Sequence, residues 1–241
     1  MSNFLPDLLV SWPRHVDYPL FRKMIRENRG RFGAVVVVFT ETSRKIDVRN
    51  FVRSSMMRDG IAFIENDPSD GVTDWRDLAV KKGLGYGDSP WVFFTEQDLT
   101  PLEGFWKQAE NFVEAGYEIF GAFVDKRLHP CCIFAKRSLI NKTDKYFGVV
   151  PDRLDHFGKF QEDVESTGAQ IGEMPEPTYK HMNGLTQNMS ILQNGEEPNY
   201  YPEEFKQYLQ ECLDLCKEGD FENTCAPRLD FFKLAREYLK K

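Results

Sequence analysis

Two acidic side chains at the end of an apolar run are the first candidates for chemistry in this 241-residue sequence. Glu96 and Asp98 are separated by one residue and follow Trp91–Thr95 (WVFFT), whose apolar character predicts a buried strand. If the backbone turns there, both carboxylates can face the same side. Such a pair suits a hard divalent cation such as Mn²⁺ or Mg²⁺, which prefers oxygen ligands and takes more of them from a phosphate substrate. Acidic residues at a strand end are also common in solvated turns and helix caps, so the pair alone does not establish a metal site.

The elements that would position these carboxylates alternate between short apolar runs and amphipathic segments. The apolar runs predict strands at residues 8–12, 32–40, 61–65 and 91–95, and helical spacing predicts helices at 18–28, 47–58, 74–82 and 102–115. Val35 to Val38 are four consecutive valines, which indicates a strand that is covered on both faces. Strands that alternate with helices predict right-handed crossovers and a mostly parallel sheet with helices on its faces.

Polar residues follow the predicted strands at the edge where such sheets bind ligands. The carboxyl ends are followed by Trp12-Pro13-Arg14, Glu41-Thr42, Asn66-Asp67 and Glu96-Gln97-Asp98. Ligands of open α/β sheets bind outside the carboxyl ends of the strands. We therefore expect a binding site at this edge.

The second half of the sequence is less regular. Strands are predicted at 119–124, 131–135 and 169–171, a helix at 155–167, and two further helices at 202–217 and 227–240. The polar run 183–199 predicts a mobile segment. We expect one domain over residues 1–182, with two halves at 1–125 and 126–182. Residues 183–241 would add the mobile segment and C-terminal helices packed on that domain.

Composition and charge exclude several classes of protein. With 41% hydrophobic and 29% charged residues the chain is neither disordered nor fibrous. A net charge of -7 argues against strong sequence-independent binding to nucleic acid, which requires many Lys and Arg side chains. No stretch is apolar and long enough to span a membrane, no signal peptide is evident, and a cytoplasmic location is expected. The five cysteines lack the paired spacing of a zinc-thiolate site and are interpreted as core residues.

The order of elements and motifs resembles the GT-A fold glycosyltransferases, in particular the inverting family 2. The resemblance covers residues 8–181 and depends on LLVSWPRHVDYPLFRKMI, VVVVFTETS and WVFFTEQDL. These lie where that family has a strand with a Pro-containing turn and helix, a strand that ends in an acidic turn, and the strand that carries its DXD motif. The resemblance implies a Rossmann-like nucleotide-sugar fold, with residues 1–125 as the nucleotide-sugar half and 126–182 as the acceptor-side half. It also implies a sugar transfer from a nucleotide-sugar donor, with a UDP-sugar expected.

The resemblance also implies which residues bind the donor. Trp12, Pro13 and Glu41 would line the base and ribose pocket, with Arg14 beside them; Glu41 stands where the family has Asp. A basic residue of the helix before the DXD strand would contact the donor, and Arg76 and Lys81 remain equal candidates. Gln97 would contribute from within the acidic motif.

Metal ligands and a base follow from the same resemblance. Asp98 would bind Mn²⁺ or Mg²⁺ directly, and Glu96 would bind the metal, a metal-bound water or the ribose, although Glu departs from the family pattern. His181 would be a further ligand, or an ordinary surface or core histidine. Asp155 would be the general base that deprotonates the acceptor hydroxyl, or only a helix N-cap. The region with His129-Pro130-Cys131-Cys132 and Lys136-Arg137 would face the acceptor and diphosphate.

Two other functions remain open at this stage. A sugar nucleotidyltransferase would need a Gly-rich basic loop after the first strand, and SWPRHVDYP contains no glycine. A non-catalytic protein of the same fold, acting in binding or as a scaffold, is the other alternative. The acceptor could be a saccharide, a small molecule or a modified nucleic-acid base, and the C-terminal helices could mediate a homo-oligomer.

Overall fold

We analysed a computed structural model of the chain, which describes residues 4–12, 18–39, 60–65, 75–96, 98–124, 127–143, 157–175, 177–182, 184–217 and 229–241. The predicted helix at 47–58 lies outside these residues.

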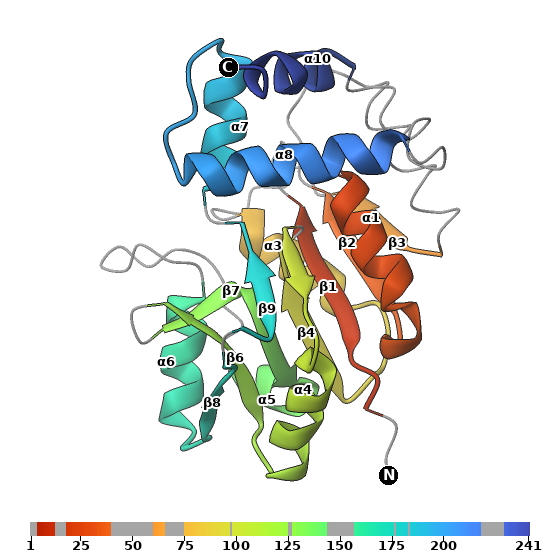
Figure 1. Cartoon of the computed structure of the whole chain (residues 1–241). Coiled ribbons are helices and arrows are strands. Elements are labelled where there is room, and N and C mark those ends of the chain that lie inside the picture. The colour runs from red at the N-terminus through yellow and green to blue at the C-terminus, as the bar shows by residue number, and fades with distance from the viewer. Residues whose placement is uncertain are drawn as a thin grey trace.

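A mixed sheet forms the centre of the molecule (Figure 1). Within the described residues it has seven strands in the order β3-β2-β1-β4-β7-β6-β8. These strands are β1 (Asp7–Trp12), β2 (Val35–Phe39), β3 (Ala62–Glu65), β4 (Trp91–Thr95), β6 (Ile119–Val124), β7 (Arg127–Lys136) and β8 (Ile171–Glu173). β3, β2, β1 and β4 are parallel neighbours, β7 is antiparallel to both β4 and β6, and β8 is parallel to β6. The mostly parallel α/β sheet that the sequence predicted is confirmed.

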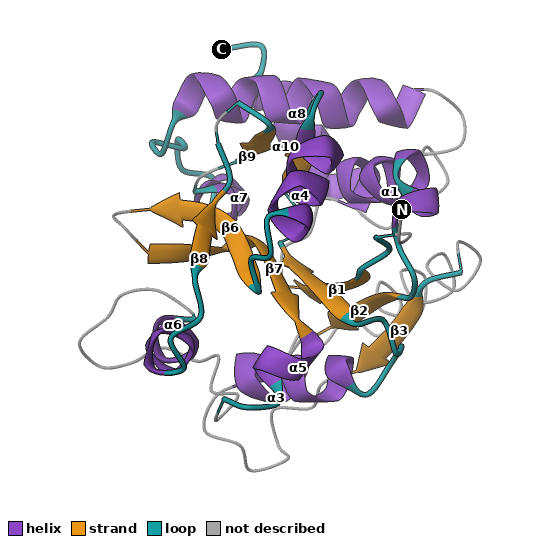
Figure 2. Cartoon of the chain, turned by 90° about the horizontal axis from the view of Figure 1, so that it is seen from below, coloured by secondary structure: helices purple, strands orange, loops and turns teal. Residues whose placement is uncertain are grey.

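Helices cover both faces of this sheet (Figure 2). α1 (Tyr18–Glu27) and α4 (Phe105–Glu114) pack on one face, and α3 (Trp75–Leu84), α5 (Arg137–Ile140) and α6 (Gly158–Ser166) pack on the other. Alternate β1 residues divide between these cores: Leu8 and Val10 face the first, and Leu9 faces the second. The 3₁₀ helix η1 (Arg29–Arg31) follows α1. Central strands with two buried faces explain the continuous apolar runs.

A small second sheet joins distant parts of the chain. β5 (Leu99–Pro101) follows β4 closely and pairs antiparallel with β9 (Tyr179–His181), with Leu99 opposite His181. The two strands are short and separated by about eighty residues, so their pairing was not evident from the sequence. It determines the geometry of the site described below.

The C-terminal part forms a helical layer beyond the sheet (Figure 1). It contains α7 (Leu185–Gln193), α8 (Pro202–Lys217) and α10 (Leu229–Tyr238). A separate apolar cluster joins these helices, and Leu20 of α1 packs against it. The layer is thus attached to the sheet domain through α1.

The prediction of a mobile segment at 183–199 was wrong for α7. Leu185, Met189 and Leu192 lie on one helical face at i, i+4 and i+7 and are buried in the C-terminal cluster. The Asn188 side chain donates to the carbonyl of Tyr200 and accepts from the Tyr200 amide at 3.0 Å. The many Asn, Gln and Gly residues concealed this apolar stripe.

No helix in the described part of the chain is both long enough and apolar enough to cross a membrane.

Candidate functional site

Glu96 and Asp98 lie in the turn that connects β4 to β5. The Leu99 amide is 3.5 Å from the Glu96 carbonyl, which closes this turn. The Asp98 side chain is only 6% exposed, whereas Glu96 is 31% exposed. The chain reverses where the sequence predicted an acidic strand end, and both carboxylates face the same neighbour.

That neighbour is His181, the last residue of β9. Its Nε2 atom lies 3.2 Å from Oε2 of Glu96 and 3.4 Å from Oδ1 of Asp98. The register that places His181 opposite Leu99 brings the imidazole to the carboxylates. One ligand atom from each of the three residues can be chosen so that all lie within 4.8 Å of one another. The three side chains assigned as metal ligands are therefore brought together.

Burial and mutual charge perturb the acidity of this group. Desolvation lowers the pKa of His181, but Asp98 and then Glu96 outweigh it and raise that pKa to about 10. Desolvation also raises the pKa of Asp98 above its ordinary value, against the opposing effect of His181, and Glu96 adds to the increase. Without a metal, the imidazolium thus compensates the negative charge of the carboxylates.

The residues present fit a divalent cation. Oδ1 of Asp98 is buried and makes no well-directed hydrogen bond to the described part of the protein, although Nε2 of His181 lies 3.4 Å away. A buried polar atom without a partner costs about 1–3 kcal/mol, and a metal ion bound there would remove that cost. A carboxylate and an imidazole are ordinary ligands for Mn²⁺, and the carboxylate also suits Mg²⁺.

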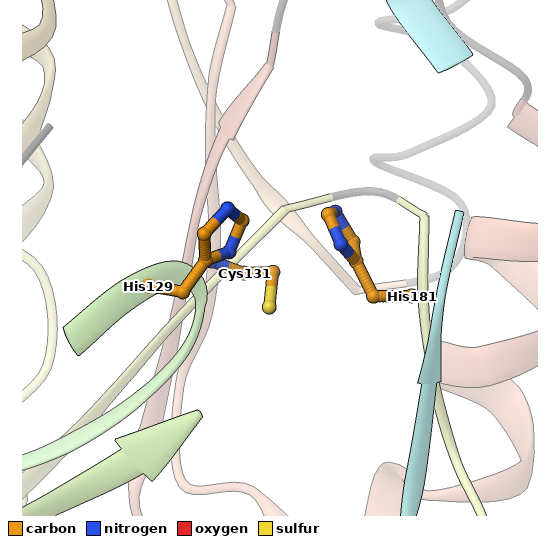
Figure 3. A group of neighbouring side chains, drawn as sticks. All are labelled: His129, Cys131 and His181. Carbon is orange, nitrogen blue, oxygen red and sulfur yellow. The ribbon is translucent and has the colours of Figure 1, made fainter. Parts of the chain in front are cut away.

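A further pair of side chains lies against His181 (Figure 3). His129 and Cys131 come from β7, and the His129 and His181 ring centroids are 5.0 Å apart. β7 pairs with β4 so that Cys132 lies opposite Thr95, and Oγ1 of Thr95 donates to the carbonyl of Cys131 at 2.7 Å. This ladder ends at Thr95, next to the acidic turn, and His129 and Cys131 lie just beyond it on β7, close to His181. The sequence reasoning assigned no metal to these two residues.

Several predicted site residues lie outside the described part of the structure. They are Pro13, Arg14, Glu41, Gln97 and Asp155. For Trp12 the structure describes the backbone but not the side chain. Val10 pairs with Thr95, so the Trp12 backbone lies two residues further along, at the level of the acidic turn.

The two basic candidates on α3 differ in their distance from this edge. α3 ends at Leu84, whose carbonyl accepts a 2.9 Å hydrogen bond from Arg137 near Asp7, the first residue of β1. The last turn of α3, with the exposed Lys81, therefore lies toward the amino ends of the strands. The first turn, which contains Arg76, is directed toward the carboxyl edge; the Arg76 side chain is outside the described residues.

Lys136 and Arg137 do not lie near the site, contrary to the expectation that they face the acceptor and diphosphate. Arg137 donates from Nη2 to Oδ2 of Asp7 at 2.7 Å, and Lys136 lies 3.6 Å from Glu118. Both pairs lie where β7 ends and β4 begins, because Trp91 pairs with Lys136. Arg137 thereby joins the amino ends of β1 and β4, and Lys136 lies beside the residue that precedes β6.

Comparison with solved structures identifies the fold. No protein-family model matches this sequence, and no curated protein matches it. The glucosyl-3-phosphoglycerate synthase of Mycobacterium tuberculosis in complex with Mn²⁺, UDP and phosphoglyceric acid is similar with a TM-score of 0.53 and 12% identity, over 81% of this chain and 80% of that one. The same enzyme with Mg²⁺ and UDP is similar with a TM-score of 0.53 and 13% identity, over 78% and 77%. Identity at this level shows the fold alone and leaves the resemblance to family 2 a prediction. The chain has a GT-A-like, Rossmann-like fold.

Proposed function

We propose that this protein is a glycosyltransferase that moves a sugar from a nucleotide-sugar donor, expected to be a UDP-sugar, to an acceptor hydroxyl. The observation that carries the proposal is the meeting of Glu96, Asp98 and His181 at the carboxyl edge of β4. The GT-A-like fold supports it, because structures of this fold include an enzyme that binds UDP together with Mn²⁺ or Mg²⁺.

Asp98 and His181 are the side chains that would hold the divalent cation. When bound, Mn²⁺ or Mg²⁺ would stabilise the negative charge that develops on the nucleoside diphosphate as it leaves. Asp98 provides a buried oxygen that lacks a hydrogen bond within the described structure. His181 provides a nitrogen on the same side.

Glu96 would extend toward the metal and the donor. Its Oε2 atom is 3.2 Å from Nε2 of His181, and its side chain remains partly exposed. The same nitrogen lies 3.4 Å from Oδ1 of Asp98, so both carboxylates face the position where a metal would bind the imidazole. Glu96 would contact that metal directly or through a bound water, or contact the ribose.

The remaining donor and acceptor roles follow from the sequence resemblance. Trp12, Pro13, Arg14, Glu41 and Gln97 would contact the nucleotide. The direction of α3 favours Arg76 over Lys81 for the basic contact. The acceptor hydroxyl would attack the anomeric carbon as the bond from that carbon to the diphosphate oxygen breaks, and Asp155 would take the hydroxyl proton, with inversion of configuration.

Binding of UDP and of UDP-glucose, each with and without Mn²⁺, tests the proposal directly. A ligand that binds the native state raises the midpoint of thermal unfolding, and we expect UDP to do so strongly only when Mn²⁺ is present. Asp98→Asn should abolish this Mn²⁺ dependence, whereas Glu162→Gln on α6, which does not belong to this group of ligands, should retain it. Release of UDP from UDP-glucose with candidate acceptors then distinguishes a transferase from a protein that only binds. Absence of both binding and release across a panel of nucleotide sugars would refute the proposal.

A further inference from the structure

A nitrogen and sulfur cluster lies next to the carboxylate site and shares one residue with it (Figure 3). One ligand atom each from His129, Cys131 and His181 can be chosen so that all lie within 4.8 Å of one another. We propose that these three side chains form a binding site for a borderline-soft divalent cation, with Zn²⁺ the best match, and that its occupation withdraws His181 from the carboxylates. The proposal of a zinc site does not depend on the proposed function. The proposed effect of Zn²⁺ on the carboxylate site rests on that function.

The two new ligands lie on β7 where its register with β6 shifts. Regular alternation of side chains does not hold across such an irregularity, and Cys131 and Cys132 both border the same apolar core. Cys131 is 2% exposed, and its sulfur lies within 4.8 Å of a ring nitrogen of His129 and of His181. Burial raises the pKa of the Cys132 thiol, which is not part of this group.

The donor set is typical of zinc. Zn²⁺ binds Cys and His in tetrahedral sites, and three protein ligands with an open fourth position are common where the metal also takes water. Thiolate ligands disfavour Mg²⁺ and Mn²⁺, which prefer oxygen, so the two overlapping sites would select different metals.

Only small movements are needed to complete the coordination. In a tetrahedral zinc site the ligand atoms lie about 3.3–3.8 Å apart. The ligand atoms of the present group lie within 4.8 Å of one another, so no pair needs to approach by more than about 1.5 Å. Nδ1 of His129 now accepts a 3.3 Å hydrogen bond from the Cys131 amide, which is long for an N–H donor. Exchange of that weak contact for a metal bond is favourable.

Because His181 belongs to both groups, the two sites would compete for it. Zn²⁺ held by His129, Cys131 and His181 would leave Glu96 and Asp98 without their imidazole neighbour. We therefore expect Zn²⁺ to weaken Mn²⁺-dependent UDP binding through Cys131, a residue outside the carboxylate site.

Titration of the full chain with Co²⁺, a spectroscopic substitute for Zn²⁺, tests the site without any assay of activity. We expect a near-ultraviolet thiolate-to-Co²⁺ charge-transfer band that Zn²⁺ displaces, measured with a reductant that is not a thiol. Cys131→Ser should lose the band, and Cys132→Ser, the matched control from the same strand, should retain it. A band that is absent from the unmodified protein, or equal in Cys131→Ser, would overturn the proposal.

His129→Gln provides a second variant that keeps the thiol in place. It should weaken Co²⁺ binding by at least about tenfold, since even the loss of an outer-shell partner costs that much. Thermal unfolding of each variant without metal establishes that it is folded before titration. Unchanged Co²⁺ affinity in folded His129→Gln would contradict the assigned ligand set.

Competition with UDP binding separates this proposal from the proposed function. Zn²⁺ should reduce Mn²⁺-dependent UDP binding in Cys132→Ser and have much less effect in Cys131→Ser. A cobalt band that depends on Cys131, without any Mn²⁺-dependent UDP binding, would refute only the proposed function. UDP binding without a band that depends on Cys131 would refute only the zinc site.

Discussion

Asp7 should be among the most sensitive positions for stability, although it lies at the end of the sheet opposite the site. Its side chain is 5% exposed. Oδ1 accepts from the Ala34 amide at 2.7 Å, and Oδ2 accepts from the Ser89 amide at 2.9 Å and from Nη2 of Arg137 at 2.7 Å. One carboxylate thereby joins the beginnings of β1, β2, β4 and the helix after β7.

Asp7→Asn preserves the size of this side chain but not its chemistry. The NH₂ group of an asparagine in place of Oδ2 would face the Ser89 amide and the Arg137 guanidinium, which are themselves hydrogen-bond donors. Arg137 would also lose the negative charge that compensates its own. Loss of one partner of a buried ion pair costs about 3–5 kcal/mol. Arg137 is 18% exposed and keeps hydrogen bonds to the carbonyls of Ser89 and Leu84, which favours the lower value. We expect a loss of about 3 kcal/mol, and at about 2–4 °C per kcal/mol for a chain of this size the Tm should fall by about 6–12 °C.

Thermal and urea unfolding monitored by circular dichroism would measure this loss, with Asp88→Asn as the matched control. Asp88 precedes Ser89 in the loop before β4 and is exposed. Arg137→Lys should also lower the Tm, because a lysine cannot reproduce the three directed hydrogen bonds of Arg137. Below its Tm, Asp7→Asn should keep Mn²⁺-dependent UDP binding. A Tm for Asp7→Asn within about 2 °C of Asp88→Asn would refute the reasoning.

Three other predictions concern the site and the elements around it. The folded-state pKa of His181, about 10, exceeds the unfolded value of about 6.5, so its contribution to metal-free stability is full below about pH 6.5 and is lost as the pH rises through 10. The stability difference between the unmodified protein and His181→Gln in urea should shrink over that range; a constant difference would contradict the assigned charge state. Gly121→Ala would place a Cβ 2.2 Å from a backbone carbonyl oxygen of β7 and should cost at least about 2 kcal/mol in urea unfolding, whereas Gly30→Ala, with open space around it, should change stability much less. Asn188→Ala should lower the Tm, because it removes both hydrogen bonds between α7 and the Tyr200 backbone before α8. An unchanged Tm would show that these bonds do not stabilise α7.

Much of the main sheet could be predicted from the sequence, because local periodicity reflects burial. The predicted strands at 91–95 and 119–124 agree with β4 and β6 residue for residue, and the predicted helix at 202–217 agrees with α8. β8 lies slightly later than predicted, and β7 begins earlier, at Arg127, because its polar first residues belong to the ladder with β6. α7 was missed because polar residues around its apolar stripe outweighed the i, i+4 and i+7 signal.

Only part of the candidate site could be predicted from neighbouring residues in the sequence. The acidic pair could be recognised because a strand, a turn and two carboxylates are adjacent along the chain. The partnership with His181 depended on a family resemblance, and His129 and Cys131 were not assigned a metal. β5 and β9 are too short to reveal their pairing, and the β4 and β7 register aligns residues that are 36 or more positions apart in the chain.

The sequence by itself determined the alternating α/β order, the buried central strands and the chemical character of the acidic turn, since each depends on neighbouring residues. The tertiary structure alone decided which distant side chains meet that turn. Antiparallel pairing of β5 with β9 brought His181 to Glu96 and Asp98, and antiparallel pairing of β4 with β7 added His129 and Cys131. Strand register is set by the packing of the whole sheet, so a one-residue shift would have turned these ligands to the opposite face.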